Sequence, residues 1–213
     1  MSAVPSATVS RLVTYLRILS QLESQGIKKT SSEHLADEAQ VSAFQVRKDL
    51  AYFGRFGTRG AGYTVPTLRR ELRRILGLTR PWSAAIVGVG RLGEAVLDYP
   101  NFGDYEFVIK GAFDVSPKKV GLTLSGIKIS PMDDIAQVVR EKGIDIGLIA
   151  VPQQGAQDAA DALVRAGIKG ILNFAPTILE VPQEIHVENV DFMASLKRLS
   201  FYILNPQLRE ALV

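Results

Sequence analysis

The sequence predicts an α/β protein in which a small basic domain precedes a larger domain built around a parallel β-sheet. Three observations predict this. Apolar runs of strand length alternate with helical segments after residue 81. A Gly-x-Gly-x-x-Gly run at residues 88–93 joins one such strand to a helix. Residues 1–80 hold 13 Lys and Arg against 6 Asp and Glu, whereas residues 81–213 hold 12 against 16. This asymmetry indicates that only the first domain meets a polyanion, unless its basic faces are merely solvated.

The composition bounds the class of protein. Of the 213 residues, 46% are hydrophobic and 22% are charged, which is ordinary for a globular chain with a substantial core. No apolar run reaches 18 residues, and the first residues do not resemble a signal peptide, so we expect a cytoplasmic protein without a membrane partner. The absence of cysteine excludes disulfides, thiolate zinc sites, iron–sulfur clusters and thiol-based redox sensing.

The first 50 residues predict three helices. Apolar residues recur at helical spacing before Gly26, with Ser6 as the N-cap; they are Val9, Leu12, Val13, Leu16, Leu19 and Leu22. Thr30 and Glu33 have capping-box spacing at the start of a short helix, and Ser42 and Gln45 have the same spacing at the start of the next. Two short helices separated by three or four residues make a helix-turn-helix.

The helix after Ser42 can be read by face. Val46, Leu50 and Phe53 form its buried stripe. The opposite face carries Phe44, Arg47, Lys48 and Ala51, with Gln45 near its edge. Cations for phosphate and guanine and an amide for adenine suit a recognition helix in a major groove. The alternative is an ordinary solvated face.

A glycine-rich segment follows and favours the DNA-binding interpretation. Residues 54–65 hold four glycines around Arg59 and predict a β-hairpin with Arg59 at its tip. A hairpin after a recognition helix is the wing of a winged helix, and a slim tip with an Arg fits a minor groove. A fourth helix with an apolar stripe is expected from Pro66. Its outer face carries Arg69, Arg70, Arg73 and Arg74. These arginines are either solvated or in contact with phosphate or with the other domain. We expect the winged-helix domain to span residues 1–78.

The second domain, residues 79–191, carries the dinucleotide-binding fingerprint of a Rossmann-like fold. Gly88 permits a tight turn, Gly90 lets the backbone approach a pyrophosphate, and Gly93 lets the helix pack on the strand. The remaining loop residues expected at the cofactor are Val89, Arg91 and Leu92. Asp114 ends the next strand and would bind the adenine ribose, favouring NAD(H) over NADP(H), a preference that Lys118 and Lys119 weaken. The alternative is a glycine turn without a ligand.

Later strand ends complete the predicted groove. Apolar runs end at residues 151 and 174, and ligands collect at the carboxyl ends of such strands. By position, Val151, Pro152, Asn173 and Ala175 therefore line the cofactor groove. The final segment, 192–213, predicts an apolar helix whose stripe holds Phe192, Leu196, Leu199 and Ile203. This helix packs either on its own sheet or on another subunit.

Several motifs in order resemble the Rex family of bacterial redox-sensing transcriptional repressors over essentially the whole chain. They are Pro5-Ser6, residues 44–50, Tyr52-Phe53-Gly54, residues 57–60, Gly62-Tyr63, residues 88–93, residues 173–176 and residues 189–192. The resemblance implies a homodimer with a swapped C-terminal helix that binds palindromic operator DNA when NADH is low relative to NAD+ and is released when NADH binds. It also implies that Tyr99 and Phe192 lie near the nicotinamide, and that Arg17 and Asp191 form a pair sensitive to the switch.

Two other classes of function compete with this interpretation. An NAD-dependent oxidoreductase needs a proton donor beside its substrate, commonly His, Lys or Tyr. The two histidines are His34, in the basic domain, and His186, before the final strand, and only about 20 residues follow the cofactor domain, too few for a substrate domain. The sequence therefore argues against an enzyme. The other class is a nucleotide-binding scaffold that does not bind DNA.

Overall fold

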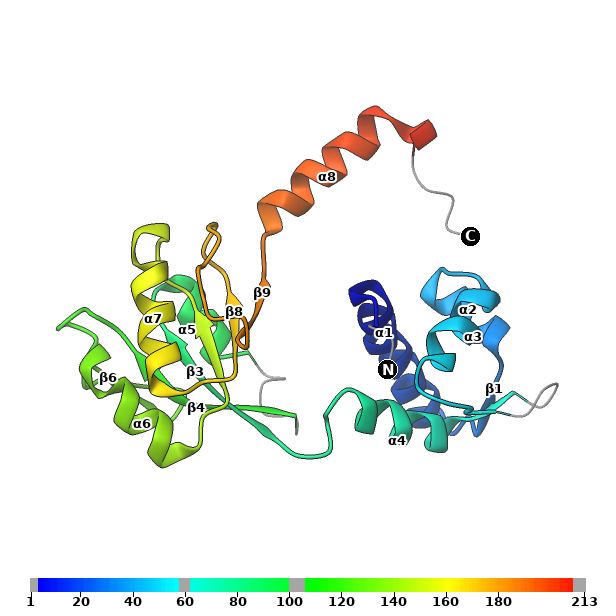
Figure 1. Ribbon diagram of the computed structural model, residues 1–213, viewed down its shortest axis with the longest axis horizontal. Helices are drawn as coiled ribbons and strands as arrows, with labels where there is room; N and C mark the ends of the chain where they lie inside the picture. The colour runs from blue at the N-terminus through cyan, green and yellow to red at the C-terminus, as the bar shows by residue number, and fades with distance from the viewer. Residues whose placement is uncertain (1–3, 58–61, 100–105, 209–213) are drawn as a thin grey trace. The chain divides into compact units, whose positions relative to one another are not determined.

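The computed structural model describes residues 4–57, 62–99 and 106–208 (Figure 1). The chain forms two compact units, the first containing the elements α1 to α4 and the second those from β3 to α8. None of the described helices has both the length and the apolar character needed to cross a membrane.

The first unit is a bundle of four helices with a small sheet. Its elements are α1 (Ser6–Ser24), β1 (Lys29–Thr30), α2 (Ser32–Ala39), α3 (Ala43–Ala51), β2 (Tyr63–Thr64) and α4 (Val65–Ile75). Leu12, Leu35, Val46 and Leu72 meet in a single apolar core. The helix-turn-helix of α2 and α3 is as the sequence predicts, and Ser42 caps α3 by accepting a hydrogen bond from the Gln45 N–H at 3.1 Å.

Three local expectations for the helices of this unit are wrong. Pro5, not Ser6, is the N-cap of α1, and no side-chain hydrogen bond is made at that cap. Val9 and Val13 are exposed, and Tyr15 and Ile18 are buried instead, because the inward face of α1 is set by packing against α3 and α4. Ser31, not Thr30, caps α2, since Thr30 is already paired in β1.

The expected hairpin is also different. Residues 54–57 form no strand, and β2 pairs antiparallel with β1, so that Lys29 lies opposite Thr64. Gly57 and Gly62 nevertheless lie close together, since a Cβ on Gly57 would lie 2.6 Å from the Gly62 carbonyl oxygen. Arg59 lies outside the described residues.

The second unit is a seven-stranded sheet in the order β5-β6-β4-β3-β7-β8-β9. Six neighbouring strands are parallel, and β5 pairs antiparallel at one edge. The strands are β3 (Trp82–Val87), β4 (Phe107–Phe113), β5 (Thr123–Leu124), β6 (Ile127–Ser130), β7 (Ile146–Ile149), β8 (Gly170–Asn173) and β9 (His186–Asn189). The order reverses at β3, which makes its carboxyl end the switch point of a Rossmann-like fold.

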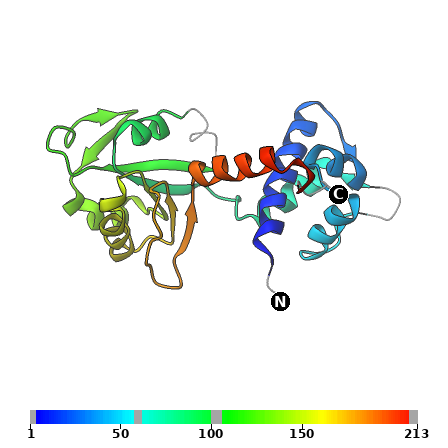
Figure 2. The same ribbon diagram turned by 90° about the horizontal axis from the view of Figure 1, so that it is seen from above.

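Helices cover both faces of this sheet (Figure 2). They are α5 (Arg91–Leu97), α6 (Ile135–Lys142) and α7 (Ala156–Ala166), with the short 3-10 turns η2 (Met132–Asp134) and η3 (Gln153–Gly155). Alternate residues of β3 face two separate cores: Ala85 and Val87 pack with α6 and α7, whereas Ala84 and Ile86 pack with Leu97 of α5. Burial on both faces explains why the central strands are almost continuously apolar.

The last helix, α8 (Phe192–Leu204), is followed by the 3-10 turn η4 (Pro206–Leu208). None of its residues is buried. Phe192, Leu199 and Ile203 are more than half exposed, so the helix does not bury its apolar stripe on its own sheet. An exposed apolar stripe is the feature expected of a segment that packs on another subunit.

Candidate nucleotide site and DNA-binding surface

The loop after β3 has a distinct steric requirement at each of its three glycines. Gly88 has φ +93°, and a Cβ there would lie 2.6 Å from the Ala150 carbonyl oxygen. A Cβ on Gly93 would lie 2.1 Å from the Gly88 carbonyl oxygen, so α5 packs directly on the turn. A Cβ on Gly90 would meet nothing within 4 Å. The loop is therefore closely packed at Gly88 and Gly93, and it has open space at Gly90, where the phosphates of a ligand would approach the protein backbone.

A cavity of about 730 Å³ adjoins this loop. It lies at the carboxyl ends of β3, β4 and β7 and extends along α6 and α7. Its lining includes Gly88, Gly90, Asp114, Val115, Lys119, Met132, Val151, Pro152, Asp158 and Arg165. The cavity thus brings together the glycine loop, the acidic residue after β4 and the strand end at Val151, which are separate in the sequence.

Asp114 organises the loop as well as lining the cavity. Its Oδ2 accepts a hydrogen bond from the Val89 N–H at 2.9 Å, and its Oδ1 accepts one from the Ser116 N–H at 2.8 Å. Lys119 Nζ lies 3.9 Å from Oδ2 and also donates to the Val89 carbonyl oxygen. A ribose hydroxyl would therefore share this carboxylate with two backbone amides and a nearby ammonium group.

Three residues expected at the cofactor lie behind the surface. The Val89 side chain is buried, and its N–H and C=O are both used by Asp114 and Lys119. Asn173 is fully buried; its Nδ2 donates to Ala175 O, Thr177 O and Asn189 Oδ1, and its Oδ1 accepts from the Ala175 N–H. Ala175 is buried too. Their geometry is that of residues that shape the turns around the cavity.

Four other residues expected at the cofactor are exposed. Arg91 and Leu92 lie in the first turn of α5, and Tyr99 follows the end of that helix. Phe192 begins α8. Among the described residues, no group of three or more His, Asp or Glu side chains could hold a metal ion.

The exposed face of α3 carries the residues expected to contact DNA. Phe44 is 67% exposed, and Arg47 and Lys48 point to the same side. Arg47 Nη1 donates to Ser32 Oγ at 2.9 Å and lies 3.3 Å from Glu33 Oε1, an exposed pair that contributes little stability. The arginine is therefore held near the N-terminus of α2 by contacts weak enough for a phosphate to replace.

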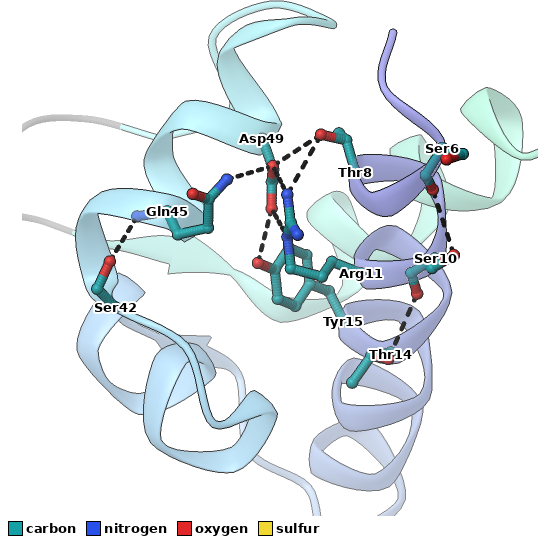
Figure 3. Close-up of polar contacts among 9 residues, drawn as sticks. All are labelled: Ser6, Thr8, Ser10, Arg11, Thr14, Tyr15, Ser42, Gln45 and Asp49. Atoms are coloured by element: carbon teal, nitrogen blue, oxygen red, sulfur yellow. Dashed lines mark hydrogen bonds and ion pairs between the residues drawn. The ribbon is translucent and has the colours of Figure 1, made fainter. Parts of the chain in front are cut away.

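Sequence reasoning missed Asp49, the most heavily hydrogen-bonded side chain described in this unit (Figure 3). It has no exposed surface, and Arg11 binds it through Nε at 2.6 Å and Nη2 at 2.8 Å. Tyr15, Thr8 and Gln45 also donate to it, at 3.0, 3.0 and 2.8 Å. Burial opposes ionisation, but these donors outweigh it and lower the pKa of the Asp49 carboxyl. Besides its place in the motif of residues 44–50, the sequence signal was an acidic residue at a helical position between the apolar Val46 and Leu50.

Arg17 and Asp191 lie in different units. Arg17 is exposed on α1, on the same face as Val9 and Val13. Asp191 precedes α8, and its Oδ1 accepts a hydrogen bond from the Ala194 N–H at 2.8 Å. Asp191 therefore caps α8, and a substitution of this residue would affect the helix end as well as any role in switching.

Known proteins resemble each of the two parts and the whole chain. A family model described as "CoA binding domain" matches residues 79–177, and one described as "Putative DNA-binding protein N-terminus" matches residues 3–51. A redox-sensing transcriptional repressor Rex of Thermus thermophilus is 61% identical over 210 residues, covering 99% of each chain. The chain belongs to the Rex family. A second Rex repressor, of Deinococcus radiodurans, is 50% identical and covers 96% of this chain and 95% of its own.

Two crystal structures agree with the fold. RSP in complex with β-NAD+ and operator DNA has a TM-score of 0.90 at 39% identity, covering 97% of this chain and 95% of its own. RSP in complex with β-NADH has a TM-score of 0.87 at 35% identity and covers both chains completely. The Rex relatives are named as repressors, so the oxidoreductase interpretation is not favoured.

Proposed function

We propose that this protein is a transcriptional repressor that binds palindromic operator DNA as a homodimer and is released when NADH binds. The proposal rests on the presence of two features in one chain. One is a recognition helix, α3, and the other is the glycine loop of residues 88–93, here called the cradle, at the switch point of a Rossmann-like sheet. Its Rex relatives are named redox-sensing repressors, and RSP has been crystallised with operator DNA and with each form of the nucleotide. A protein acting on bacterial DNA works in the cytoplasm.

On the DNA side, α3 enters the major groove and the following glycine-rich segment reaches the minor groove. The contacting residues are Ser42, Phe44, Gln45, Arg47, Lys48 and Arg59. Arg47 and Lys48 are exposed cations on a single helix face, which is the arrangement that phosphate and guanine contacts require. We assign this role to a domain spanning residues 1–78.

On the nucleotide side, the cradle fits a dinucleotide. Gly90 has free space where a pyrophosphate would approach, and the cavity beside it is large enough for the adenosine half. Asp114 would bind the ribose, while Val151 and Pro152 would line the groove. Since Val89, Asn173 and Ala175 are buried, they would act by holding the cradle in shape. We assign this role to residues 79–191.

The oxidised and reduced nucleotides differ by one charge and by ring planarity at the nicotinamide, so discrimination must occur there. An aromatic surface from Tyr99 and Phe192 would disfavour the cationic ring, because burying an unpaired charge is costly. NADH can drive a closed dimer only by binding that state more tightly. Closure would change the spacing of two recognition helices that must meet half-sites one helical turn apart. Residues 192–213 would supply the dimer contact, and Arg17 and Asp191 the switch pair.

The test is fluorescence anisotropy of a labelled palindromic duplex with A·T-rich flanks. The full-length protein is bound to it and titrated with NADH, then separately with NAD+. Release by NADH at concentrations where NAD+ has no effect would support the proposal. Binding that ignores both nucleotides would remove the sensor role, and failure to bind any duplex would restore the scaffold interpretation.

A further inference from the structure

We propose that Asp49 is a positioning residue that determines which base Gln45 reads, by fixing the orientation of the Gln45 side-chain amide. The proposal rests on α3 being the DNA-reading helix. Asp49 is fully buried and cannot reach DNA itself, whereas Gln45 is partly exposed beside the outward face of α3.

The contact that carries the proposal joins two successive turns of α3. Gln45 Nε2 donates to Asp49 Oδ1 at 2.8 Å across an i, i+4 spacing (Figure 3). The carboxylate is itself held in place, because Arg11 donates a hydrogen bond to each of its oxygens while Tyr15 and Thr8 donate one hydrogen bond each. Gln45 is thus tied to a fixed point of the core rather than to a mobile surface group.

The chemistry of the partner decides which end of the amide faces the core. An ionised carboxylate only accepts hydrogen bonds, so the amide must turn its NH2 group, and not its oxygen, towards Asp49. The donors around Asp49 lower the pKa of its carboxyl, so the group is ionised at neutral pH. The Gln45 amide is left with one acceptor, Oε1, and one Nε2–H with which to bind a base.

This remaining pair matches adenine in the major groove. Adenine presents a donor at N6 and an acceptor at N7, which one acceptor and one donor can bind together. Guanine presents two acceptors, N7 and O6, and a Gln45 with a single free N–H cannot donate to both. The buried carboxylate therefore makes Gln45 a reader of adenine instead of an amide free to turn either way.

The experiment selects bound sequences from a duplex pool in which two inverted half-sites are randomised, using the full-length protein. The readout is base enrichment at each position, a ratio that does not change with the fraction of folded protein. We compare wild type with Gln45→Met, Asp49→Asn and Thr8→Val. Thr8→Val is the matched control, since it removes a different donor to the same Asp49 oxygen and leaves Gln45 unchanged.

Wild type is expected to favour adenine at least about fivefold at one position of each half-site, and Gln45→Met to abolish that preference alone. Asp49→Asn can present its own NH2 to Gln45 and turn the amide around, so the preferred base at that position should change to guanine or thymine. Thr8→Val should keep adenine. Retention of adenine in Asp49→Asn would overturn the proposal, whereas no enrichment by wild type would instead reject the proposed DNA-binding function.

A second measurement covers the case in which Asp49→Asn does not fold. In wild-type protein labelled with 15N, the resonance absent from Gln45→Met identifies the Gln45 amide. One of its two protons should exchange with water at least about tenfold more slowly than those of the exposed Gln25, as expected for a hydrogen bond to a charged acceptor. Exchange at the same rate as Gln25 would show that the amide is not held and would overturn the proposal.

Discussion

Gly93→Ala should separate the nucleotide response from DNA binding. The new Cβ would lie 2.1 Å from the Gly88 carbonyl oxygen, whereas real Cβ atoms essentially never approach a neighbour within 3.0 Å. The neighbour is backbone in a turn with φ +93°, so α5 must move away by about 1 Å or more. Overpacking of this kind costs about 1–3 kcal/mol, which lowers the midpoint of thermal unfolding by roughly 3–15 °C.

Gly90→Ala is the matched partner of that variant. Its Cβ would meet nothing within 4 Å, and its φ of −83° suits alanine, so the stability should equal that of wild type. If a pyrophosphate approaches this backbone, the methyl group would exclude it, and NADH affinity should fall at least about tenfold. Gly170→Ala, whose Cβ would make an ordinary 3.5 Å contact away from the cavity, should change neither property.

The assays are scanning calorimetry, NADH titration calorimetry and the anisotropy of labelled operator DNA. Gly93→Ala should melt earlier and bind NADH poorly, yet it should keep its DNA affinity and stay bound when NADH is added. Wild-type NADH affinity in Gly90→Ala would refute the assignment of the loop as the phosphate cradle. An unchanged melting midpoint in Gly93→Ala would refute the close packing of α5 on the turn.

Four further outcomes are expected. The pKa of Asp49 is lower in the folded than in the unfolded state, so its contribution to stability is present above the unfolded pKa and is lost as pH falls through the folded pKa. The urea midpoint of wild type should therefore fall on acidification, and that of Asp49→Asn should fall less. Arg47→Ala should weaken DNA binding and, if it contacts phosphate, reduce the salt slope by about 1, as titrations from low to high salt would show. Leu199→Asp should convert a homodimer to monomers in sedimentation, because it places a charge on the exposed apolar stripe of α8. Asp191→Asn retains a side-chain oxygen for the α8 cap but loses the charge, whereas Asp191→Ala loses both. The switch role predicts that NADH fails to release DNA from either variant, while circular dichroism shows reduced helicity only in Asp191→Ala.

The periodic parts of the fold could be predicted from the sequence. The helix-turn-helix depends on Ser42 and the apolar spacing of α3, and the Rossmann-like topology depends on strands such as β3 and β7 that are buried on both faces. The short β5 and β6 were missed because two and four residues carry too little periodicity to distinguish them from a loop. The glycine positions could be predicted because each steric requirement is local to one turn.

The polar interior could not be predicted in the same way. Asp49 gains its importance from Arg11, Tyr15 and Thr8, which lie 34 to 41 residues earlier in the chain, and no local pattern marks those contacts. Asn173 was expected in the groove because it lies at the end of a strand, but its amide is used by the turn after β8 and by Asn189 of the neighbouring β9. Position at a strand end indicates proximity to a ligand; whether a side chain faces that ligand depends on long-range hydrogen bonds.

The Asp49 network also limits how a signal can reach the recognition helix. Removing one partner from a buried, hydrogen-bonded carboxylate is strongly destabilising, so α1 and α3 are expected to move together. A second link reinforces the unit, since Arg69 of α4 lies 2.6 Å from Glu23 of α1. Arg17 is exposed on α1, the helix whose Thr8, Arg11 and Tyr15 side chains bind Asp49 of α3. A contact made by Arg17 would therefore displace the whole DNA-binding unit as a rigid body, and release would follow from the altered separation of two intact recognition helices rather than from rearrangement within either one.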